Sequence, residues 1–376
     1  MQLCFIESNI DFFACFKYHL FIMKIQEKTK LSHLTTIKLG GEASKFVECI
    51  SSKDILEALK YAKENKLKVW ILGGGSNTIF SDKGFDGLVL KMDLKGMEFK
   101  ETGDSVIATS ASGENWDEFV SMCVRKGLAG VEALSGIPGS VGATPIQNVG
   151  AYGAEVGDTI SLVKAIDRDT LEEVEFTNEE CMFKYRTSRF KKADKDKYII
   201  TSVEFRLIKE GAPAIRYPQL QKKVAEKYGD DIGAGRDALK AVREIVLGLR
   251  RGKSMVIDEL DPNSQSCGSF FTNPILSPDE FRLLEQKFRS ADGEGEIPTF
   301  PEGPEDVKVP AAWLIEQSGF EKGFKHKGSA ISENHNLALV NHGEITSDVL
   351  ELADLIQEKV LQKFGVELEK EPIVVE

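Results

Sequence analysis

The chain has 376 residues, more than one hydrophobic core ordinarily serves, so two or three domains are expected. Its 48 basic and 60 acidic side chains give a net charge of −12, which argues against a nucleic-acid partner because neutralising phosphates needs a basic face. The six cysteines are widely spread and form no C-x-x-C pair, so free thiols are expected, with no disulfide frame and no metal site.

Residues 1–23 are rich in aromatic and apolar side chains and superficially resemble a targeting segment. However, Glu7 and Asp11 lie where a signal peptide has its basic start and apolar core, and no small-residue cleavage site follows. The segment also lacks 18 consecutive apolar residues, so it is not expected to span a membrane. We predict that translation starts at Met23, that residues 1–23 are a non-structural extension, and that the protein is cytoplasmic.

The next part of the chain predicts a helix followed by two strands. Residues 51–66 carry an apolar stripe at helical spacing, and Ser51 or Ser52 can cap the helix. The apolar runs at 68–72 and 87–91 are short enough to be buried strands. Together they indicate a β-α-β unit.

Short strands dominate residues 94–210, and helices dominate the following stretch, 212–253. The expected strands are 105–109, 160–167, 173–176 and 198–207. One helix at 115–126 is expected to end at Gly127. Beyond Ser254 we expect helices at 278–290, 311–317 and 348–364, and then a terminal strand at 367–375. The predicted class is α+β.

A glycine turn, Leu72-Gly-Gly-Gly-Ser-Asn77, follows the first buried strand. Its amides and the Ser76 hydroxyl can hold a pyrophosphate, because a backbone without Cβ atoms can approach a ligand closely. The dinucleotide fingerprint G-x-G-x-x-G fails here, since Thr78 or Phe80 would occupy its last position. A plain glycine turn is the alternative interpretation.

A second glycine-rich segment, residues 135–153, reads SGIPGSVGATPIQNVGAYG. A surface loop would carry more charge, whereas such a stretch of exposed amides suits the wrapping of a large cofactor.

The two segments together resemble the FAD-binding sequences of UDP-N-acetylenolpyruvoylglucosamine reductases, which have the vanillyl-alcohol-oxidase/PCMH type of FAD-binding fold. The resemblance extends over residues 24–376, and three further segments match in order: 184–188 (KYRTS), 268–274 (GSFFTNP) and 368–371 (LEKE). It implies two FAD-binding subdomains, 24–92 and 93–253, a smaller α+β substrate-binding domain, 254–364, and a C-terminal strand, 365–376, that returns to the FAD site.

The resemblance also implies the ligands and the residues that hold them. Non-covalent FAD would contact Gly73, Gly74, Gly75, Ser76, Asn77, Ser135, Gly136, Pro138, Gly139, Gly142, Thr144, Gln147, Asn148, Gly150, Ala151, Tyr152 and Gly153. The UDP-sugar would contact Tyr217, Lys253, Asn273 and His335, where Tyr217 belongs to a substrate-capping tyrosine loop that marks one subclass. NADPH would be the reductant, and the chain is expected to be a monomer.

The implied reaction reduces an enolpyruvyl ether in peptidoglycan precursor synthesis and yields UDP-N-acetylmuramate. One alkene carbon needs a hydride and the other a proton, while enolate-like charge develops on the carboxylate. The resemblance implies hydride transfer from NADPH through flavin N5, Ser269 as proton donor, and Arg186 and Glu371 beside the carboxylate. Arg186 suits a bidentate grip, and a protonated Glu371 could donate to the enolate oxygens.

Each of these three residues also has an ordinary structural interpretation. Ser269 could be a turn or cap serine, Arg186 a solvated cation and Glu371 an exposed tail carboxylate. Only their occurrence together with the glycine segments favours catalysis.

Three rival functions remain to be weighed. A phosphate-binding P-loop ending at Gly252-Lys-Ser254 would need glycine at position 247, which is Leu247. An FAD-dependent oxidase of the same fold is disfavoured by the tyrosine loop and by the GSFFTNP segment. A catalytically silent nucleotide-sugar-binding protein would have no need of Ser269, Arg186 and Glu371 together.

Overall fold

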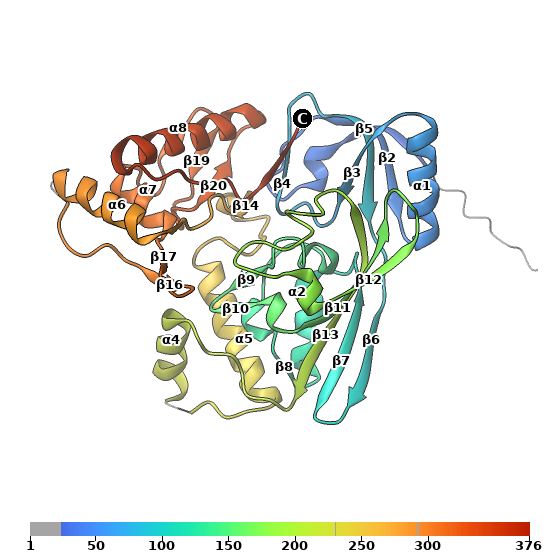
Figure 1. Ribbon diagram of the computed structural model, residues 1–376, viewed down its shortest axis with the longest axis horizontal. Helices are drawn as coiled ribbons and strands as arrows, with labels where there is room; N and C mark the ends of the chain where they lie inside the picture. The colour runs from blue at the N-terminus through green and yellow to red at the C-terminus, as the bar shows by residue number, and fades with distance from the viewer. Residues whose placement is uncertain (1–23, 230, 292) are drawn as a thin grey trace, which may run out of the picture.

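The computed structural model describes residues 24–229, 231–291 and 293–376, so the predicted extension at 1–23 lies outside the described residues. Figure 1 shows three sheet-containing parts: an N-terminal sheet at the upper right, a larger twisted sheet below it, and a helix-covered C-terminal part at the left. The division at residues 92, 253 and 364 stays a prediction.

The N-terminal sheet confirms the predicted helix and both predicted strands, 68–72 and 87–91, and adds two strands that precede the helix. Its order is β1-β2-β5-β3, from β1 (Gln26–Lys30), β2 (Glu42–Cys49), β3 (Lys68–Leu72) and β5 (Phe85–Met92). Strands β2 and β3 both run parallel to β5 and therefore to each other. Helix α1 (Ser52–Glu64) is the crossover connection from β2 to β3. The Ser51 side chain caps α1 by accepting the amide of Asp54 at 3.2 Å.

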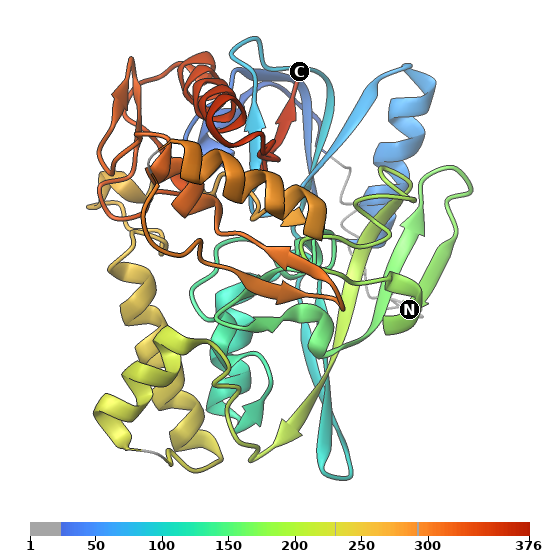
Figure 2. The same cartoon turned by 60° about the vertical axis from the view of Figure 1, so that its left-hand side comes forward.

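The large sheet is antiparallel and has the order β12-β11-β13-β7-β6, with β8 at the end of β13. Its strands are β6 (Met97–Thr102), β7 (Ser105–Ala111), β8 (Leu128–Ala129), β11 (Ile160–Asp167), β12 (Glu173–Thr177) and β13 (Tyr198–Lys209). Three helices, α2 (Trp116–Arg125), α4 (Pro218–Tyr228) and α5 (Arg236–Arg251), lie beside it in Figure 2. Between sheet and helices the fully buried Trp116, Phe119 and Phe205 form the centre of its core.

Short elements lie within and around the second glycine-rich segment. They are η2 (Glu132–Leu134), η3 (Val141–Ala143), β9 (Gly150–Ala151), β10 (Ala154–Glu155), η4 (Val156–Asp158) and α3 (Asn178–Cys181). The helix predicted at 115–126 is confirmed as α2, with the Asn115 side chain accepting the amide of Glu118.

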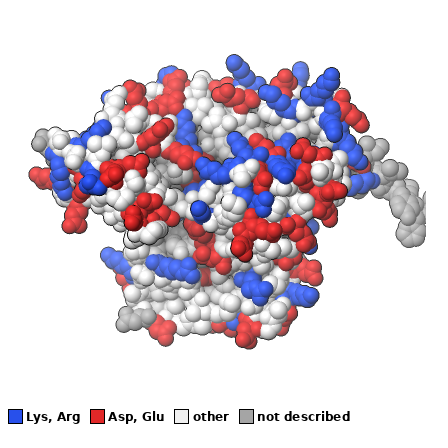
Figure 3. All heavy atoms as spheres, in the orientation of Figure 1, with Lys and Arg blue, Asp and Glu red and all other residues white. Residues whose placement is uncertain are grey.

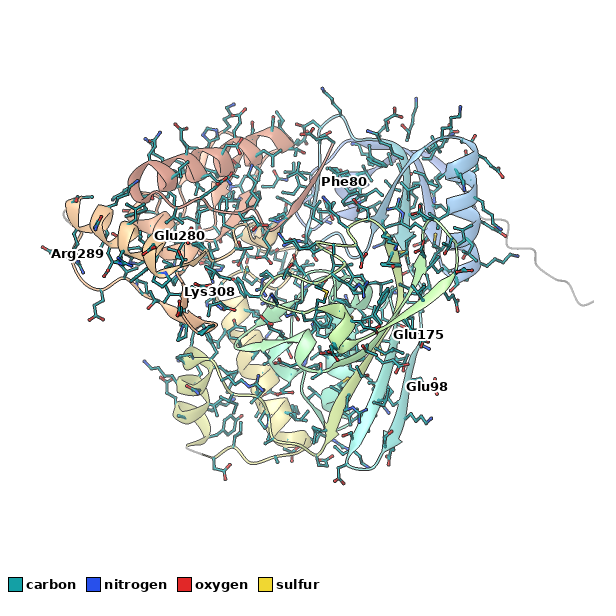
Figure 4. All side chains as sticks on the ribbon, viewed as in Figure 1. Phe80, Glu98, Glu175, Glu280, Arg289 and Lys308 are labelled. Carbon is teal, nitrogen blue, oxygen red and sulfur yellow. The ribbon has the colours of Figure 1, made fainter. Side chains whose placement is uncertain are left out.

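The C-terminal part packs helices over a second antiparallel sheet of order β14-β20-β19-β18. Its elements are η5 (Pro262–Ser264), β14 (Ser266–Ser269), β15 (Ile275–Leu276), α6 (Pro278–Ser290), β16 (Phe300–Glu302), β17 (Asp306–Lys308), α7 (Ala311–Gln317), β18 (Lys325–His326), β19 (Ser329–Ile331), β20 (Ala338–Asn341) and α8 (Thr346–Phe364). The helices expected at 278–290, 311–317 and 348–364 are thus confirmed. Figure 4 labels Arg289 at the outer tip of this part and Lys308 on its inner side.

The last residues leave the C-terminal part and join the N-terminal one. Strand β21 (Ile373–Val375) pairs in parallel with β4 (Thr78–Phe80), directly after the first glycine turn, as Figure 1 shows. The strand predicted at 367–375 was too long, because residues 367–372 make only an isolated bridge from Lys370 to Phe271. Pro372 has no amide to donate, which explains why regular pairing begins only after it.

The thiols of Cys49, Cys123, Cys181 and Cys267 are buried and unbonded, which confirms the expectation for these four. On the face seen in Figure 3, acidic and basic side chains are intermixed.

Candidate active site

The first glycine turn packs backbone to backbone against the second glycine-rich segment. Ser76 Oγ donates to the Pro138 carbonyl at 3.0 Å, and a Cβ placed on Gly74 would lie 2.5 Å from the Cα of Gly139. Glycine at position 74 is therefore required by the close approach of the two loops.

This loop pair offers donors that the protein itself does not use. In the described part of the chain, the amides of Gly74, Gly75, Ser76 and Asn77 donate to no backbone carbonyl, and the buried hydroxyl of Ser140 has no partner. A cavity of about 430 Å³ adjoins Gly74. Unpartnered amides at a glycine turn suit the oxygens of a pyrophosphate. The residues present therefore fit the diphosphate of FAD.

Gly74→Ala is expected to reduce FAD retention at least about tenfold, equivalent to about 1.4 kcal/mol, because the new Cβ would push the two loops apart. Flavin content per polypeptide after gel filtration measures the effect. Gly248→Ala is the matched control, since no atom lies within 4 Å of a Cβ at this α5 position and alanine favours the helix. Equal flavin content in both variants would mean that the loop contact does not shape the cofactor site.

An ion pair beneath the second loop fixes its first glycine. Asp117 on α2 accepts the Gly136 amide at 2.5 Å and a two-pronged contact from Arg243 on α5, at 2.5 and 2.7 Å. Burial raises the pKa of the Asp117 carboxyl, but the Arg243 and Gly136 hydrogen bonds and the nearby guanidinium charges outweigh it, so the pKa lies below its ordinary value.

Asp117→Asn is expected to lower the free energy of unfolding by about 2 kcal/mol at pH 7, because a charged hydrogen-bond acceptor is lost. A carboxyl with a lowered folded pKa stabilises the protein above its unfolded pKa of 3.8 and loses this contribution as the pH falls through the folded value. The difference between variant and parent should therefore shrink below pH 3.8. Urea unfolding at several pH values measures it, with the exposed neighbour changed in Glu118→Gln as control. A difference that stays constant with pH would contradict this role.

Arg186 and Glu371 meet although they lie on distant segments. Arg186 Nε is 3.1 Å from Glu371 Oε1, and Arg186 Nη2 donates to the Gly150 carbonyl at 2.8 Å. The Nε–H is not aligned with any acceptor, so the first contact is an ion pair rather than a well-formed hydrogen bond. Arg186 also has φ +51, a left-handed conformation that costs a non-glycine residue about 1–2 kcal/mol.

Hydrogen bonds tie Glu371 to both glycine segments. Gln147 Nε2 donates to Glu371 Oε1 at 3.2 Å, and Asn77 Nδ2 donates to Gln147 Oε1 at 3.0 Å and to the Glu371 carbonyl at 3.2 Å. Burial raises the pKa of the Glu371 carboxyl, and the charges of Arg186 and Lys191, the close Arg186 contact and the hydrogen bond from Gln147 only partly offset this. The site therefore holds a carboxyl that takes up a proton more readily than an exposed glutamate.

Ser269 belongs to the C-terminal part and precedes a residue that is bonded to Glu371. It ends β14, and the carbonyl of the next residue, Phe270, accepts the Glu371 amide at 2.9 Å. Gly268 before it has φ +75, a left-handed turn for which glycine is suited. Arg186 and Glu371 are thus in direct contact, and the backbone next to Ser269 is bonded to Glu371.

Three of the four predicted substrate residues lie in a second, more basic group. Tyr152 and Tyr217 meet edge to face with ring centroids 5.7 Å apart, and Lys253 Nζ lies 6.0 Å from the Tyr152 ring centroid. Burial, followed by the charges of Lys253, Lys322 and Arg250, lowers the pKa of His335 to about 4. A neutral imidazole among cations suits an anionic group such as a diphosphate.

Several predicted ligand residues are occupied by contacts within the protein. Asn148 donates to Glu155 and to the Lys184 carbonyl and accepts the Gly157 amide, so its side chain is fully used in holding the loop. The Asn273 side-chain oxygen accepts the Ala311 amide and caps α7. The hydroxyls of Ser76, Ser135 and Thr144 donate to the carbonyls of Pro138, Glu132 and Val141. At these positions the bonded side-chain atoms hold the loop in shape. A ligand could be bound only by atoms that make no such internal hydrogen bond.

Three contributing residues escaped the sequence analysis. Gln219 accepts from Lys253 at 3.1 Å, and Lys322 and Lys191 add charge near His335 and Glu371. Their segments are ordinary polar sequence, so only the folded chain reveals these neighbours.

Comparison with known proteins decides what this arrangement represents. Residues 43–171 match the FAD binding domain family, and residues 261–375 match the C-terminal domain of UDP-N-acetylenolpyruvoylglucosamine reductase. The UDP-N-acetylenolpyruvoylglucosamine reductase of Thermobifida fusca is 42% identical over 92% of this chain and 96% of its own, and that of Streptomyces coelicolor is 43% identical over 92% and 88%. The chain belongs to the UDP-N-acetylenolpyruvoylglucosamine reductase family.

Family membership makes the chain an FAD-dependent oxidoreductase and confirms the predicted fold class. The crystal structure of the UDP-N-acetylenolpyruvylglucosamine reductase of Thermus caldophilus has the same fold, with a TM-score of 0.63 at 22% identity over 94% of this chain and 99% of that one. Among the residues that the structure describes, no helix is both long and apolar enough to cross a membrane.

Proposed function

We propose that this chain uses NADPH to reduce UDP-N-acetyl-3-O-(1-carboxyvinyl)glucosamine to UDP-N-acetylmuramate in peptidoglycan precursor synthesis. The observation that carries the proposal is the convergence of the Arg186–Glu371 pair, the backbone beside Ser269, and both glycine segments, the first of which has unpartnered amides. An oxidase of this fold or a silent binding protein would not require that convergence.

Bound FAD would supply the redox chemistry, accepting a hydride from NADPH and giving it to the alkene. The residues of the chain supply the rest. Arg186 holds the substrate carboxylate and stabilises the negative charge that develops there, and a protonated Glu371 donates a hydrogen bond to it. Ser269 gives a proton to the other alkene carbon, which requires that the carbanion be more basic than the serine alkoxide.

The basic group around Lys253 is the proposed diphosphate site. Lys253 Nζ and the Tyr217 ring both lie against Tyr152. The charges of Lys253, Lys322 and Arg250 act on His335. Burial, followed by Arg250 and Lys322, lowers the pKa of Lys253, so an arriving anion would relieve repulsion among these cations. We further propose that the enzyme acts as a cytoplasmic monomer, which light scattering can test for oligomeric state.

An anaerobic optical titration of the purified protein tests the function. The expected result is a flavin band that bleaches with NADPH and returns only when the enolpyruvyl UDP-sugar is added. A band that returns only with oxygen would favour the oxidase alternative. Failure to bind or take up flavin would overturn the assignment.

A further inference from the structure

Lys191 is a charged residue bonded to Arg186 that the proposed mechanism leaves without a role. It is half-buried, follows the KYRTS segment, and its Nζ donates to the Arg186 carbonyl at 3.1 Å. That carbonyl belongs to the residue with φ +51, so the ammonium is bonded to the backbone at its left-handed position.

The surroundings of Lys191 are mixed in charge. The carboxyls of Glu369 and Glu371 attract its ammonium, and the cations Arg186 and Lys192 repel it. Among the described residues it forms no ion pair within 4.0 Å, whereas Arg186 contacts Glu371 directly. Lys191 therefore acts on Glu371 across space and on Arg186 through a bond.

We propose that Lys191 is a positioning residue for the reduction, holding Arg186 in its left-handed conformation and adding the second positive charge that faces Glu371. This inference rests on the proposed function and deepens it. The groups that act on Glu371 are Arg186, Lys191 and Tyr185 from one segment and Gln147 from the second glycine segment. Lys191 is the only cation of this set besides Arg186.

The consequence for proton occupancy has a definite sign. The positive charge of Lys191 lowers the pKa of the Glu371 carboxyl, so removal of that charge must raise it further. A limb of the pH–rate profile governed by Glu371 would then move to higher pH, whether the active form is protonated or ionised.

Lys191→Met, Lys191→Arg and the exposed-neighbour control Lys192→Met test the proposal. The substrate half-reaction of Lys191→Met should slow about tenfold through misplacement of Arg186, with its pH limb moved upward. Lys191→Arg should keep the limb in place because it keeps the charge, and Lys192→Met should match the parent. A second readout that needs no turnover is the infrared carboxyl band assigned to Glu371 by its loss in Glu371→Gln, whose pH midpoint should rise in Lys191→Met.

The two readouts separate failure of this proposal from failure of the function. A parent protein that the UDP-sugar cannot reoxidise overturns the proposed function, while the infrared midpoint still decides on Lys191. An unshifted midpoint in a folded Lys191→Met, or an equal shift in Lys191→Arg, overturns the role of the Lys191 charge.

Discussion

Ser269→Ala is expected to bleach normally with NADPH but to slow the following reoxidation by the enolpyruvyl UDP-sugar by about 10²–10⁴-fold, the contribution of a positioned proton donor. Only the second half-reaction should be affected, because Ser269 and the glycine loops proposed to hold FAD lie in different parts of the molecule. Ser269 ends β14 one residue before the Phe270 carbonyl that accepts the Glu371 amide, whereas the glycine loops proposed to hold FAD come from the other two parts of the molecule. Anaerobic stopped-flow spectroscopy measures the two half-reactions separately.

Ser269→Cys is the companion variant, because it restores an acidic hydrogen at the same position in the β14 turn. It should recover part of the lost rate and should steepen the dependence on pH, since a thiol ionises nearer to neutrality than a hydroxyl. If Ser269→Ala reoxidised at the parental rate, another group or a water molecule would be the proton donor.

The regular elements followed from the sequence because their signals are local. The cap Ser51, the stripe of α1 and the stop after α2 depend on neighbours within a few residues. The glycine loops were equally readable, since the backbone approach at Gly74 leaves no room for a Cβ.

The hydrogen-bond partners of the polar side chains could not be predicted from the sequence. Asn148 looked like a ligand residue, yet its three hydrogen bonds are all internal. Lys191 has no sequence signal of a special role, yet it is bonded to the Arg186 carbonyl. The length of β21 was overestimated because its pairing depends on β4, a partner far away in the sequence. The neighbouring contact between Asn77 and Glu371 spans 294 positions of the chain. Such facts belong to tertiary contacts, which a single sequence leaves unspecified.

Glu371→Gln is expected to change activity and stability in opposite directions. The substrate half-reaction should slow about 10²–10³-fold, because the glutamine amide is a weaker hydrogen-bond donor than a protonated carboxyl to the charge that develops on the substrate carboxylate. Bleaching by NADPH should be unaffected.

Stability should instead rise at alkaline pH. Burial raises the folded pKa of Glu371 above its ordinary value of 4.5, with Arg186, Lys191 and Gln147 opposing. A carboxyl with a raised folded pKa gives its full contribution below the unfolded value of 4.5, and that contribution is lost as the pH rises through the folded pKa. The parent therefore bears the cost of a buried charge at pH 8, which glutamine avoids while its side chain can still contact Gln147.

Thermal unfolding at pH 4 and pH 8 measures this second effect. The melting temperature of Glu371→Gln should exceed that of the parent at pH 8 and approach it at pH 4, while the exposed neighbour changed in Glu369→Gln should follow the parent at both. A variant less stable than the parent at pH 8 would show that the ion pair with Arg186 outweighs the burial of the carboxylate. Because a purely structural glutamate would lose stability and activity together, opposite signs would mark Glu371 as a residue kept for the reaction at the expense of the fold.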